Sequence, residues 1–511
     1  MRSTFHSIEI AKRSLFTEQA NISTTGHNIA NANTPGYSRQ RVNLVASRPI
    51  EAPGFMRTNI PGQLGTGVEF TSITRVREKF LDDQFRNANR SLGEWSIQSD
   101  TLGKLETIFN EPSDSGVRTV MDNFWKSWTD LSKDPESITG RKIVRENALA
   151  LVDAMNETSK HLTDLQADLT TNLSTKTDQI NSISNSIADL NLEIKRLEAY
   201  GDNPNDLMDE RDYLVDQLSK MVNVTVVNTA DGYNITVGDI VLVNGTNAPG
   251  TTVEALEDQF NGGGVVGGEV EGLIISRDQI LPDYKNQLDA MVDTLVNGEI
   301  TVTLPAGSTY NGTQLAADTP VTVNGINGLH QLGFLFNTPP DTPMQAGDIF
   351  TTSDGSGAVT AANIRLSQDI IDDPMNIATS LRTAVVDGSL ETVKGNNTLA
   401  NLMAGLKETR FQFTPVASQN GITNGTLDEF YASMIGQLGL QAQEADRQTT
   451  NQQDITTQVD SRRQSVSGVS LDEEMSELIK FQHAYSAAAR FMTTIDETLD
   501  KIINGMGVVG R

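Results

Sequence analysis

The sequence predicts an α+β protein of several domains, with paired coiled-coil-like terminal helices, an elongated helical-bundle domain and inserted β-domains. Three observations support this prediction. A chain of 511 residues is too long for one ordinary core. Apolar residues recur at helical spacing near both ends and through most of 78–221, whereas the spacing changes to period two from Val222 onward. Aromatic residues make up only 5%, which suits thin helical bundles better than thick sandwiches.

The first predicted helix covers residues 4–33. Positions 5, 8, 12, 15, 19, 22, 26 and 29 follow a 3,4 spacing that would place Phe5, Ile8, Leu15, Ile22 and Ile29 on one face. Lys12, Gln19 and Gly26 interrupt this stripe, so we expect the helix to need a partner surface or to stay largely unfolded.

The helix is predicted to stop in the sequence NIANANTPGYSRQ (28–40). Pro35 lacks a backbone donor and disfavours a helical Thr34, while Gly36 permits a positive φ and Asn31 and Asn33 can cap the helix end. Residues 37–45 then alternate as an extended segment, and loop or short strand is expected to about residue 80.

The central region is predicted to change from helix to strand and back. A long helix ending near Gly201 carries a 3,4-spaced seam, followed by a second, antiparallel helix in 203–222. The seam consists of Leu162, Leu165, Leu169, Ile180, Ile183, Ile187, Leu190, Ile194 and Leu197. Period-two spacing from Val222, with DG at 231 and NG at 244, predicts hairpins. A helix from Tyr284 to Asn297 interrupts the strands, which resume at Ile300 with turns at NG 311, NG 324 and DG 354, and helix dominates again from Asn396 to Asp460.

The last element is predicted to be a helix that begins at Ser470 with the capping pattern Ser470 to Glu473. Its apolar row has near-heptad spacing with lapses at Gln482 and Asp496. The row consists of Leu471, Met475, Leu478, Tyr485, Ala489, Met492, Leu499, Ile503 and Met506. Two readings stay open: the row complements the stripe of the first helix, or the helix docks on its own domain.

These changes suggest seven segments along the chain. They are an N-terminal segment (1–85), the outgoing helical domain (86–221), a first β part (222–268), a helix returning to the helical domain (269–298), a second β part (299–395), the helical return (396–468) and the C-terminal helix (469–511).

The charge distribution excludes some classes of function. A net charge of −27 argues against nucleic-acid binding, which needs a basic face. Residues 1–60 carry +4 against −31 for the remainder, so the first segment is either a solvated basic helix or a basic surface for another subunit. The chain has no Cys and no apolar run long enough to insert in a membrane. No signal-peptide pattern opens the sequence, and we expect no classical secretion route.

No motif predicts catalysis, a cofactor or a metal. Gly262, Gly264 and Gly267 form a literal G-x-G-x-x-G, but the polar sequence before them predicts a turn and no dinucleotide site. The five histidines include no i,i+4 metal pair. The acids of DLMDERDYLVD (206–216) around Arg211 predict an ion-paired helix face in preference to an acid-base dyad.

Several sequence blocks resemble one family. NIANANTPGYSRQRVNL (28–44) and VSLDEEMSELIKFQHAYSAAARFMTTIDETLDKIIN (469–504) look like the terminal motifs of the flagellar rod, hook and hook-associated axial proteins. Two further blocks, NDLMDERDYLVDQLSKMVNVTV (205–226) and GGEVEGLIISRDQILPDYKNQLDAM (267–291), are similar to members that join hook to filament. The chain departs from compact members between Asn297 and Gly325, where an extra β subdomain is expected.

The resemblance implies a non-enzymatic structural subunit whose terminal helices pair in an inner domain while β-domains project outward. It implies termini that fold only among neighbours, and export by the flagellar apparatus without a cleaved signal, aided by a cytoplasmic chaperone. The implied partners are the hook protein, a second hook-filament junction protein and the chain itself, in a closed ring of about eleven subunits. The implied assembly residues are Asn31, Asn33, Thr34, Pro35, Gly36, Tyr37, Leu471, Glu474, Met475, Leu478, Ile479, Tyr485, Met492 and Leu499.

Three alternatives remain open. Hook and distal rod proteins share the termini but lack the long helical block at 95–220. An exported enzyme would have to place its pocket in the β insertions of 222–395. An autonomous coiled-coil adhesin would form stable oligomers in solution.

Overall fold

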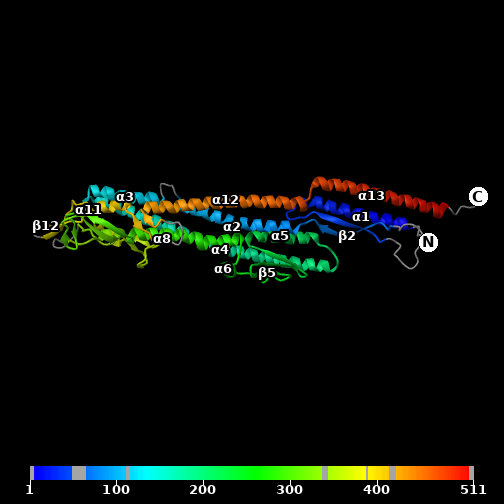
Figure 1. The fold of residues 1–511 in the computed structure, drawn as a ribbon, viewed down its shortest axis with the longest axis horizontal. Coiled ribbons are helices and arrows are strands. Elements are labelled where there is room, and N and C mark those ends of the chain that lie inside the picture. Colours follow the sequence, from blue (N-terminus) through cyan, green and yellow to red (C-terminus); the bar gives the residue numbers. More distant parts are fainter. Residues whose placement is uncertain are drawn as a thin grey trace, which may run out of the picture. The chain divides into compact units, whose positions relative to one another are not determined.

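The computed structural model describes residues 5–48, 65–110, 116–336, 343–386, 389–413 and 422–505. The chain divides into two compact units, and Figure 1 shows the elements of both. Unit 1 comprises 1–94, 174–271 and 450–511, and unit 2 comprises 95–173 and 272–449. Three long helices contribute residues to both units: α2 (Lys79–Phe109), α4 (Ile138–Ala199) and α12 (Leu427–Ser467). The α+β prediction is confirmed, because long helices are combined with small separate sheets.

Unit 1 begins and ends with helices that lie side by side (Figure 1). They are α1 (His6–Ala30) and α13 (Leu471–Asp500), and a short π-helical turn, η4 (Lys501–Gly505), follows α13. The pair is antiparallel, since Asn28 near the end of α1 hydrogen-bonds Glu474 in the first turn of α13. Ser470 caps α13 by accepting from the Glu473 N–H, as the sequence predicts.

The buried face of α1 is not the predicted stripe. Phe5 is 61% exposed, and Lys12, Gln19 and Gly26 are exposed as well. The buried residues lie about half a turn away and are small or polar: Ala11, Thr17, Asn21, Thr24, Thr25 and Asn28. Small side chains let two backbones approach closely, and the asparagines can hydrogen-bond across the contact. These two effects outweigh a sparse and interrupted apolar stripe.

The predicted row of α13 is only partly buried. Leu478 and Met492 are half-buried and Leu499 is buried, on the side of the helix that also holds the buried Glu474, Ala488 and Ile495. Leu471, Met475, Tyr485 and Ile503 are exposed instead, and Met506 lies outside the described residues. The prediction therefore merged two faces of the helix into one.

An antiparallel ribbon of β1 (Gln40–Ala46) and β2 (Val68–Arg75) leaves the end of α1. Its register runs from Gln40 opposite Arg75 to Ala46 opposite Val68, with a bulge between Asn43 and Leu44. The predicted extended segment after residue 37 is confirmed. An ion pair between Arg13 and Glu69 links the ribbon to α1.

The rest of unit 1 follows the predicted change from helix to strand. The seam of α4 buries Ile180, Ile187 and Ile194 in this unit, and Gly201 has the positive φ of 90° that ends a helix. The remaining elements are α5 (Asn205–Met221), a meander of β3 (Thr225–Thr229), β4 (Gly232–Val237) and β5 (Ile240–Asn244), and α6 (Val253–Asn261). Asp231 and Gly232 lie at the predicted hairpin turn, whereas Asn244–Gly245 reverses the chain after β5 without joining two strands. Gly262, Gly264 and Gly267 lie in a turn, as predicted.

Unit 2 packs helices and short strands around an aromatic and aliphatic core. Its largest fully buried side chains include Trp128, Phe124, Leu151, Tyr284 and Phe350. Its helices are α3 (Val117–Lys133), η1 (Ser276–Ile280), α8 (Leu281–Asn297), α9 (Gly325–Gln331), α10 (Gln368–Asp372), η2 (Pro374–Asn376), α11 (Thr398–Gly405) and η3 (Leu406–Glu408), while α7 (Gly268–Ile275) begins in unit 1.

The strands of unit 2 form two-stranded sheets. The pairs are β6 (Glu299–Leu304) with β9 (Thr319–Asn324), β7 (Thr309–Tyr310) with β8 (Thr313–Gln314), β10 (Phe350–Thr352) with β11 (Ile364–Leu366), β12 (Thr383–Val386) with β13 (Ser389–Thr392), and β14 (Phe411–Gln412) with β15 (Asn424–Gly425). Asn311 and Gly312 both have positive φ, as a two-residue hairpin turn requires.

One prediction for unit 2 is wrong. Asn324–Gly325 does not form a turn between two strands, because Gly325 with φ 52° starts α9. Helix dominates from Asn396 to Asp460 as predicted, with β14 and β15 between α11 and α12. Asn-Gly favours a positive φ at glycine, but that preference alone does not tell a hairpin from the start of a helix.

Candidate assembly site at the TPGY turn

The site is built on the turn that ends α1. Asn31 Nδ2 donates to the His27 carbonyl at 3.1 Å, and Thr34 Oγ1 donates to Asn31 Oδ1 at 3.1 Å. Gly36 has φ 80°, and a Cβ there would lie 2.7 Å from the Cβ of Tyr213 on α5. Gly36 is therefore required both by the backbone conformation and by the close approach of α5. Asn33, Thr34 and Pro35 remain exposed.

A single buried amide joins the turn to both terminal elements. Asn28 Nδ2 donates to the Gln40 carbonyl (3.0 Å) and to Glu474 Oε2 (2.9 Å). Its Oδ1 accepts from Tyr37 Oη (2.8 Å) and from the Gln40 N–H (2.9 Å). The other carboxylate oxygen of Glu474 accepts from Arg39 Nε at 2.6 Å. Since Asn28 uses all four of its hydrogen-bonding positions, α1, the ribbon and α13 are fixed to one another at this point.

Tyr37 acts only as a donor in this arrangement. Burial raises the pKa of the phenol, and Asp206, Asp209 and Glu474 raise it further. The Tyr37 ring also meets His27 edge to face, with centroids 5.6 Å apart. The hydroxyl therefore stays protonated at neutral pH and keeps its hydrogen bond to Asn28.

Beneath the turn lies a buried cluster of arginines and aspartates, which we call the ion-pair network. Arg75 Nη1 lies 2.8 Å from both Asp209 and Asp212, and Arg86 Nε lies 2.8 Å from Asp216. The eight members come from four separate segments of the sequence: Arg75 and Arg77 at the end of the ribbon, Asp82 and Arg86 on α2, Asp209, Asp212 and Asp216 on α5, and Arg463 on α12. The Ser38 N–H donates to Asp209 at 2.8 Å, which attaches the TPGY turn to the network.

The electrostatics of the network keep most members charged. Burial alone would lower the pKa of Arg77, but Asp212 and Asp82 outweigh that effect and raise it. Burial alone would raise the pKa of Asp212, but Arg77, Arg75 and Arg86 outweigh it and lower the pKa. Asp209 differs, because burial raises its pKa despite Arg75, whose charge is shared with Asp212. Removing one partner from such a cluster leaves a buried charge uncompensated, at a cost of roughly 3–5 kcal/mol.

The predicted ion-paired face of α5 is correct in kind and wrong in its partners. Asp209, Asp212 and Asp216 do not pair with Arg211 of their own helix. Arg211 Nη1 donates to Asn191 of α4 at 2.9 Å, and its guanidinium lies 3.5 Å from the centre of the Tyr233 ring. Spacing along α5 shows that the acids share a face, but it does not show which distant arginines cover that face.

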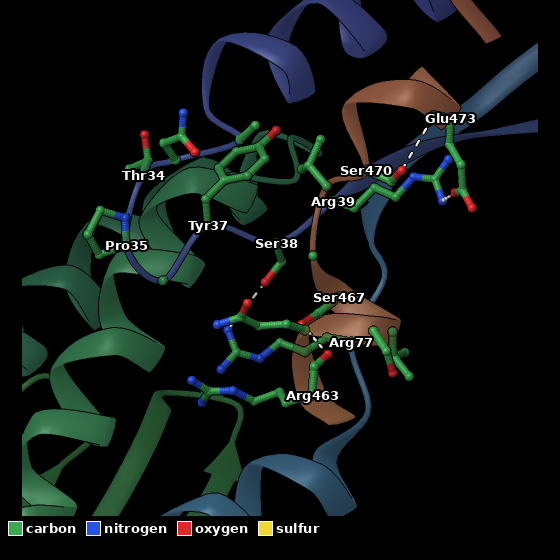
Figure 2. Close-up of a pocket in the computed structure, with 18 of the residues that line it drawn as sticks. Thr34, Pro35, Tyr37, Ser38, Arg39, Arg77, Arg463, Ser467, Ser470 and Glu473 are labelled. Atoms are coloured by element: carbon green, nitrogen blue, oxygen red, sulfur yellow. Dashed lines mark hydrogen bonds and ion pairs between the residues drawn. The ribbon is translucent and has the colours of Figure 1, made fainter. Parts of the chain in front are cut away.

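A hollow of about 450 Å³ opens beside the turn (Figure 2). It is lined by residues 32–39 and 464–470, with the side chains of Arg77, Arg463 and Glu473. Figure 2 shows Arg39 and Glu473 paired at one side of the hollow, and Ser38 lies beside Arg77 at the other. Among the described residues, no group of three His, Cys, Asp or Glu is arranged to hold a metal ion. The geometry provides a polar contact between the segments 28–40 and 464–474, which are far apart in sequence. We call this contact the joint.

The predicted site residues therefore separate into several sets. Tyr37 and Glu474 both hydrogen-bond Asn28 at the joint, and Asn31 and Thr34 hold the turn next to them. Leu478, Met492 and Leu499 lie on the packed side of α13, whereas Leu471, Met475 and Ile479 form an exposed row on the same helix. Sequence reasoning missed Asn28, Asp82 and the arginines of the network, although it expected the acids of α5 to be ion-paired. Asn28 lies inside the quoted signature, but nothing in the spacing distinguished it from Asn31 and Asn33.

No helix among the described residues is long and apolar enough to cross a membrane. Both terminal segments match profiles of flagellar proteins: residues 8–37 match the flagella basal body rod protein family, and 461–505 match the flagellar basal body rod FlgEFG protein C-terminal family. Together with the paired terminal helices, these matches define the class as that of flagellar axial proteins.

The remaining comparisons identify the family. Residues 102–313 match the flagellar hook-associated protein FlgK helical domain. The chain is 35% identical to flagellar hook-associated protein 1 of Bacillus subtilis over 100% of both sequences. It is 26% identical to the Salmonella typhimurium protein of that name and 25% to the Escherichia coli one, over 97% of this chain and 99% of each relative. The chain belongs to the flagellar hook-associated protein 1 family, and it is a structural protein of the flagellum.

A solved structure agrees on the fold. The flagellar hook junction protein FlgK from Burkholderia pseudomallei matches with a TM-score of 0.50 at 14% identity. The match covers 75% of this chain and 100% of that one. The helical domain match and the full-length relatives favour the hook-associated protein 1 family over the hook and distal rod proteins.

Proposed function

We propose that the chain forms the junction between the hook and the filament as a closed ring of about eleven copies. In this proposal the hook protein lies on one side and the second hook-filament junction protein on the other. Segments 1–85 and 469–511 form the inner layer, and the β parts at 222–268 and 299–395 face outward. The role is non-enzymatic.

One observation carries the proposal: the terminal helices bury mainly small and polar residues against each other and leave several large apolar ones exposed. Buried apolar side chains are few on α1 and α13, namely Ala11, Ala488, Ile495 and Leu499 among the described residues. Phe5, Phe16, Leu471, Met475 and Ile479 are about half exposed or more. Ordering a helix costs roughly 1–2 kcal/mol per residue in backbone entropy, so this pair is marginal alone and gains stability when neighbours cover the exposed residues.

The exposed apolar residues also support the proposed export route. A helix that is marginal in the monomer can pass through a narrow channel unfolded and fold on arrival. A cytoplasmic chaperone would bind the exposed face of α13 before export and no signal would be cleaved.

The test is complementation of cells that lack this chain. We expect deletion of residues 6–30 to abolish filament anchoring to hooks, because α13 then loses its partner. The matched control removes the β7–β8 hairpin tip (residues 309–314) of unit 2, which we expect to leave anchoring intact. Full anchoring by the 6–30 deletion would contradict the proposal. Sedimentation of the purified chain separates it from the adhesin alternative, since an adhesin is a stable oligomer and the proposed junction subunit is a monomer.

A further inference from the structure

The exposed row of α13 and a groove beside β1 have complementary properties. Leu471, Met475 and Ile479 recur every four residues on one face of α13 and are 48%, 49% and 52% exposed. We call these three residues the α13 row. A row of this kind on a soluble chain marks a surface that another molecule covers.

The groove lies in unit 1 between α1, β1 and α13 and has a volume of about 650 Å³. Its lining combines polar and charged side chains with an apolar part made of Val42, Leu44, Val76 and Phe481. Leu44 is 49% exposed at its rim. Among the described strands β1 pairs only with β2, and on its opposite edge the Gln40 N–H and C=O are hydrogen-bonded to Asn28. The groove thus offers apolar side chains among polar ones beside β1.

The groove and the α13 row each have one exposed charged residue without an ionic partner, and the two charges are of opposite sign, although the groove lining as a whole holds charges of both signs. Arg41 lines the groove, is exposed, and forms no ion pair with another described residue. Asp472 lies next to the α13 row, is exposed, and likewise has no ionic partner among the described residues. Asp472 belongs to an acidic first turn with Glu473 and Glu474, whereas the first segment of the chain is basic.

The α13 row cannot dock in the groove of its own molecule, because α13 itself forms one wall of that groove. It can dock in the groove of another copy. Glu474, Glu477 and Phe481 of α13 line the groove, and the α13 row lies roughly 120° around the same helix, at 100° per residue. One helix therefore presents a groove wall on one side and an apolar row on another. Two different complementary patches on one subunit form a heterologous contact, which builds a ring if the repeated rotation closes and an open helix if it does not.

We propose that the α13 row of one subunit docks in the groove between α1, β1 and α13 of the next copy of this chain, with Asp472 facing Arg41. The inference rests on the proposed ring and deepens it by assigning the contact between subunits. The partner is a second copy because the chain itself supplies both surfaces with matching charges.

Cysteine cross-linking tests this contact directly, since the chain has no Cys of its own. Leu44→Cys and Met475→Cys are made in separate chains and co-expressed in cells that lack the native chain, and isolated hook-filament assemblies are then oxidised. A disulfide between the two single variants can form only between molecules, and it requires Cα atoms about 4.4–6.8 Å apart. We expect a dimer band containing both chains. The matched control replaces Leu44→Cys with Tyr200→Cys, which is 86% exposed in unit 1 and outside the groove, and should give at least tenfold less cross-link.

A charge exchange tests the orientation. We expect Arg41→Glu to reduce filament anchoring at least fivefold and Arg41→Glu with Asp472→Arg to restore it. Arg48→Glu is the matched control, because Arg48 is an exposed arginine near the end of the ribbon that does not line the groove. The inference would be overturned by assemblies that anchor filaments normally but give no band joining the Leu44→Cys chain to the Met475→Cys chain, or that give a band with a different protein. Either result would leave the proposed function in place. A native chain that fails to restore anchoring would instead contradict the proposed function.

Discussion

The region around the TPGY turn and α1 in unit 1 and the core of unit 2 bury different kinds of side chain. Unit 2 encloses Trp128, Phe124, Phe350, Tyr284 and Leu151, with ring contacts among the aromatic residues. Unit 1 has buried apolar residues along α4 and in its β-meander, but it encloses aspartates and arginines beneath the TPGY turn and threonines and asparagines along α1. Apolar burial stabilises without a particular partner, whereas buried charges and amides stabilise only when every partner is in place.

This difference indicates which parts of the chain are stable in the isolated monomer. The buried apolar area of unit 2 stabilises it without neighbouring subunits. The terminal helices of unit 1 depend on single contacts such as Asn28 with Glu474, and their apolar residues are left for neighbours. We therefore expect unit 2 to be the stable part of the monomer and the α1–α13 pair to be its weakest part.

The largest effect is expected from the ion-pair network. Asp212→Asn removes a charge that lies 2.8 Å from Arg75 and within 3.6 Å of Arg86, and it leaves buried guanidiniums uncompensated. We predict a loss of about 3–5 kcal/mol in the local stability of unit 1, measured by native-state hydrogen exchange. Asp231→Asn breaks a solvent-exposed pair with Lys195 and should have little effect on stability, because water screens the charges. Equal losses of stability in the two variants would show that the buried network stabilises unit 1 no more than an exposed ion pair does.

A core truncation gives the corresponding measurement for unit 2. Leu151→Ala deletes a fully buried side chain on α4 and should cost roughly 2–5 kcal/mol through lost burial and the cavity left behind. Leu440→Ala in the same unit is the control, since Leu440 is 67% exposed and its loss should change stability by less than about 0.5 kcal/mol. Denaturant unfolding followed by tryptophan fluorescence suits this test because Trp95, Trp125 and Trp128 all belong to unit 2.

Acid should weaken unit 2 before the network of unit 1. His330 is neutral and fully buried: its Nδ1–H donates to the Gly347 carbonyl at 2.6 Å, and Nε2 accepts from the Ala378 N–H at 2.9 Å. Burial lowers the pKa of His330 to about 4. The folded pKa lies below the unfolded value of about 6.5, so stability is complete above 6.5 and falls as the pH drops toward 4, by about 3 kcal/mol at most.

The carboxylate Asp212 loses its contribution in a different pH range. Its folded pKa is lowered, so its stabilisation is present above the ordinary value of 3.8 and is lost only below it. Hydrogen exchange of unit 2 amides at pH 7.5 and 5.0 checks the prediction, with His330→Gln as the variant that should remove the pH dependence. An unchanged slope in that variant would assign the acid sensitivity to another group.

The smallest effect is expected from a variant that replaces a buried polar group of unit 1 with an apolar group, as in the core of unit 2. Thr24→Val keeps the shape of a buried residue on α1 and replaces a hydroxyl with a methyl group. We predict a gain of about 1 kcal/mol in the local stability of the α1–α13 pair in the monomer. Ser23→Val on the exposed side of the same helix should give no gain. A loss of stability in Thr24→Val would mean that the hydroxyl has an essential hydrogen bond.

The sequence alone predicted the buried residues correctly where one apolar spacing runs through a whole segment. Most of the Leu and Ile seam of α4 was predicted correctly. Buried are Leu162, Leu165, Leu169, Ile180, Ile187 and Ile194, whereas Ile183, Leu190 and Leu197 are half-buried. The chemistry of the turn at Pro35 and Gly36 was also predictable, because few residues permit that backbone.

The rest failed because it depends on distant partners. The buried face of α1 was misplaced because apolar residues were expected to turn inward, whereas Asn28 meets Gln40 and Glu474 there. The partners of Asp209, Asp212 and Asp216 were missed for the same reason, since Arg75, Arg86 and Arg463 are far from α5 in the sequence. Periodicity identifies a face but does not identify what covers it.

Hydrogen exchange of the purified monomer, read by mass spectrometry, tests the central claim most directly. The account predicts that amides of 17–28 on α1 and 474–495 on α13 exchange at least 100-fold faster than those of 117–133 on α3, and that they become protected in isolated hook-filament assemblies. Equal protection of the three helices in the dilute monomer would contradict it.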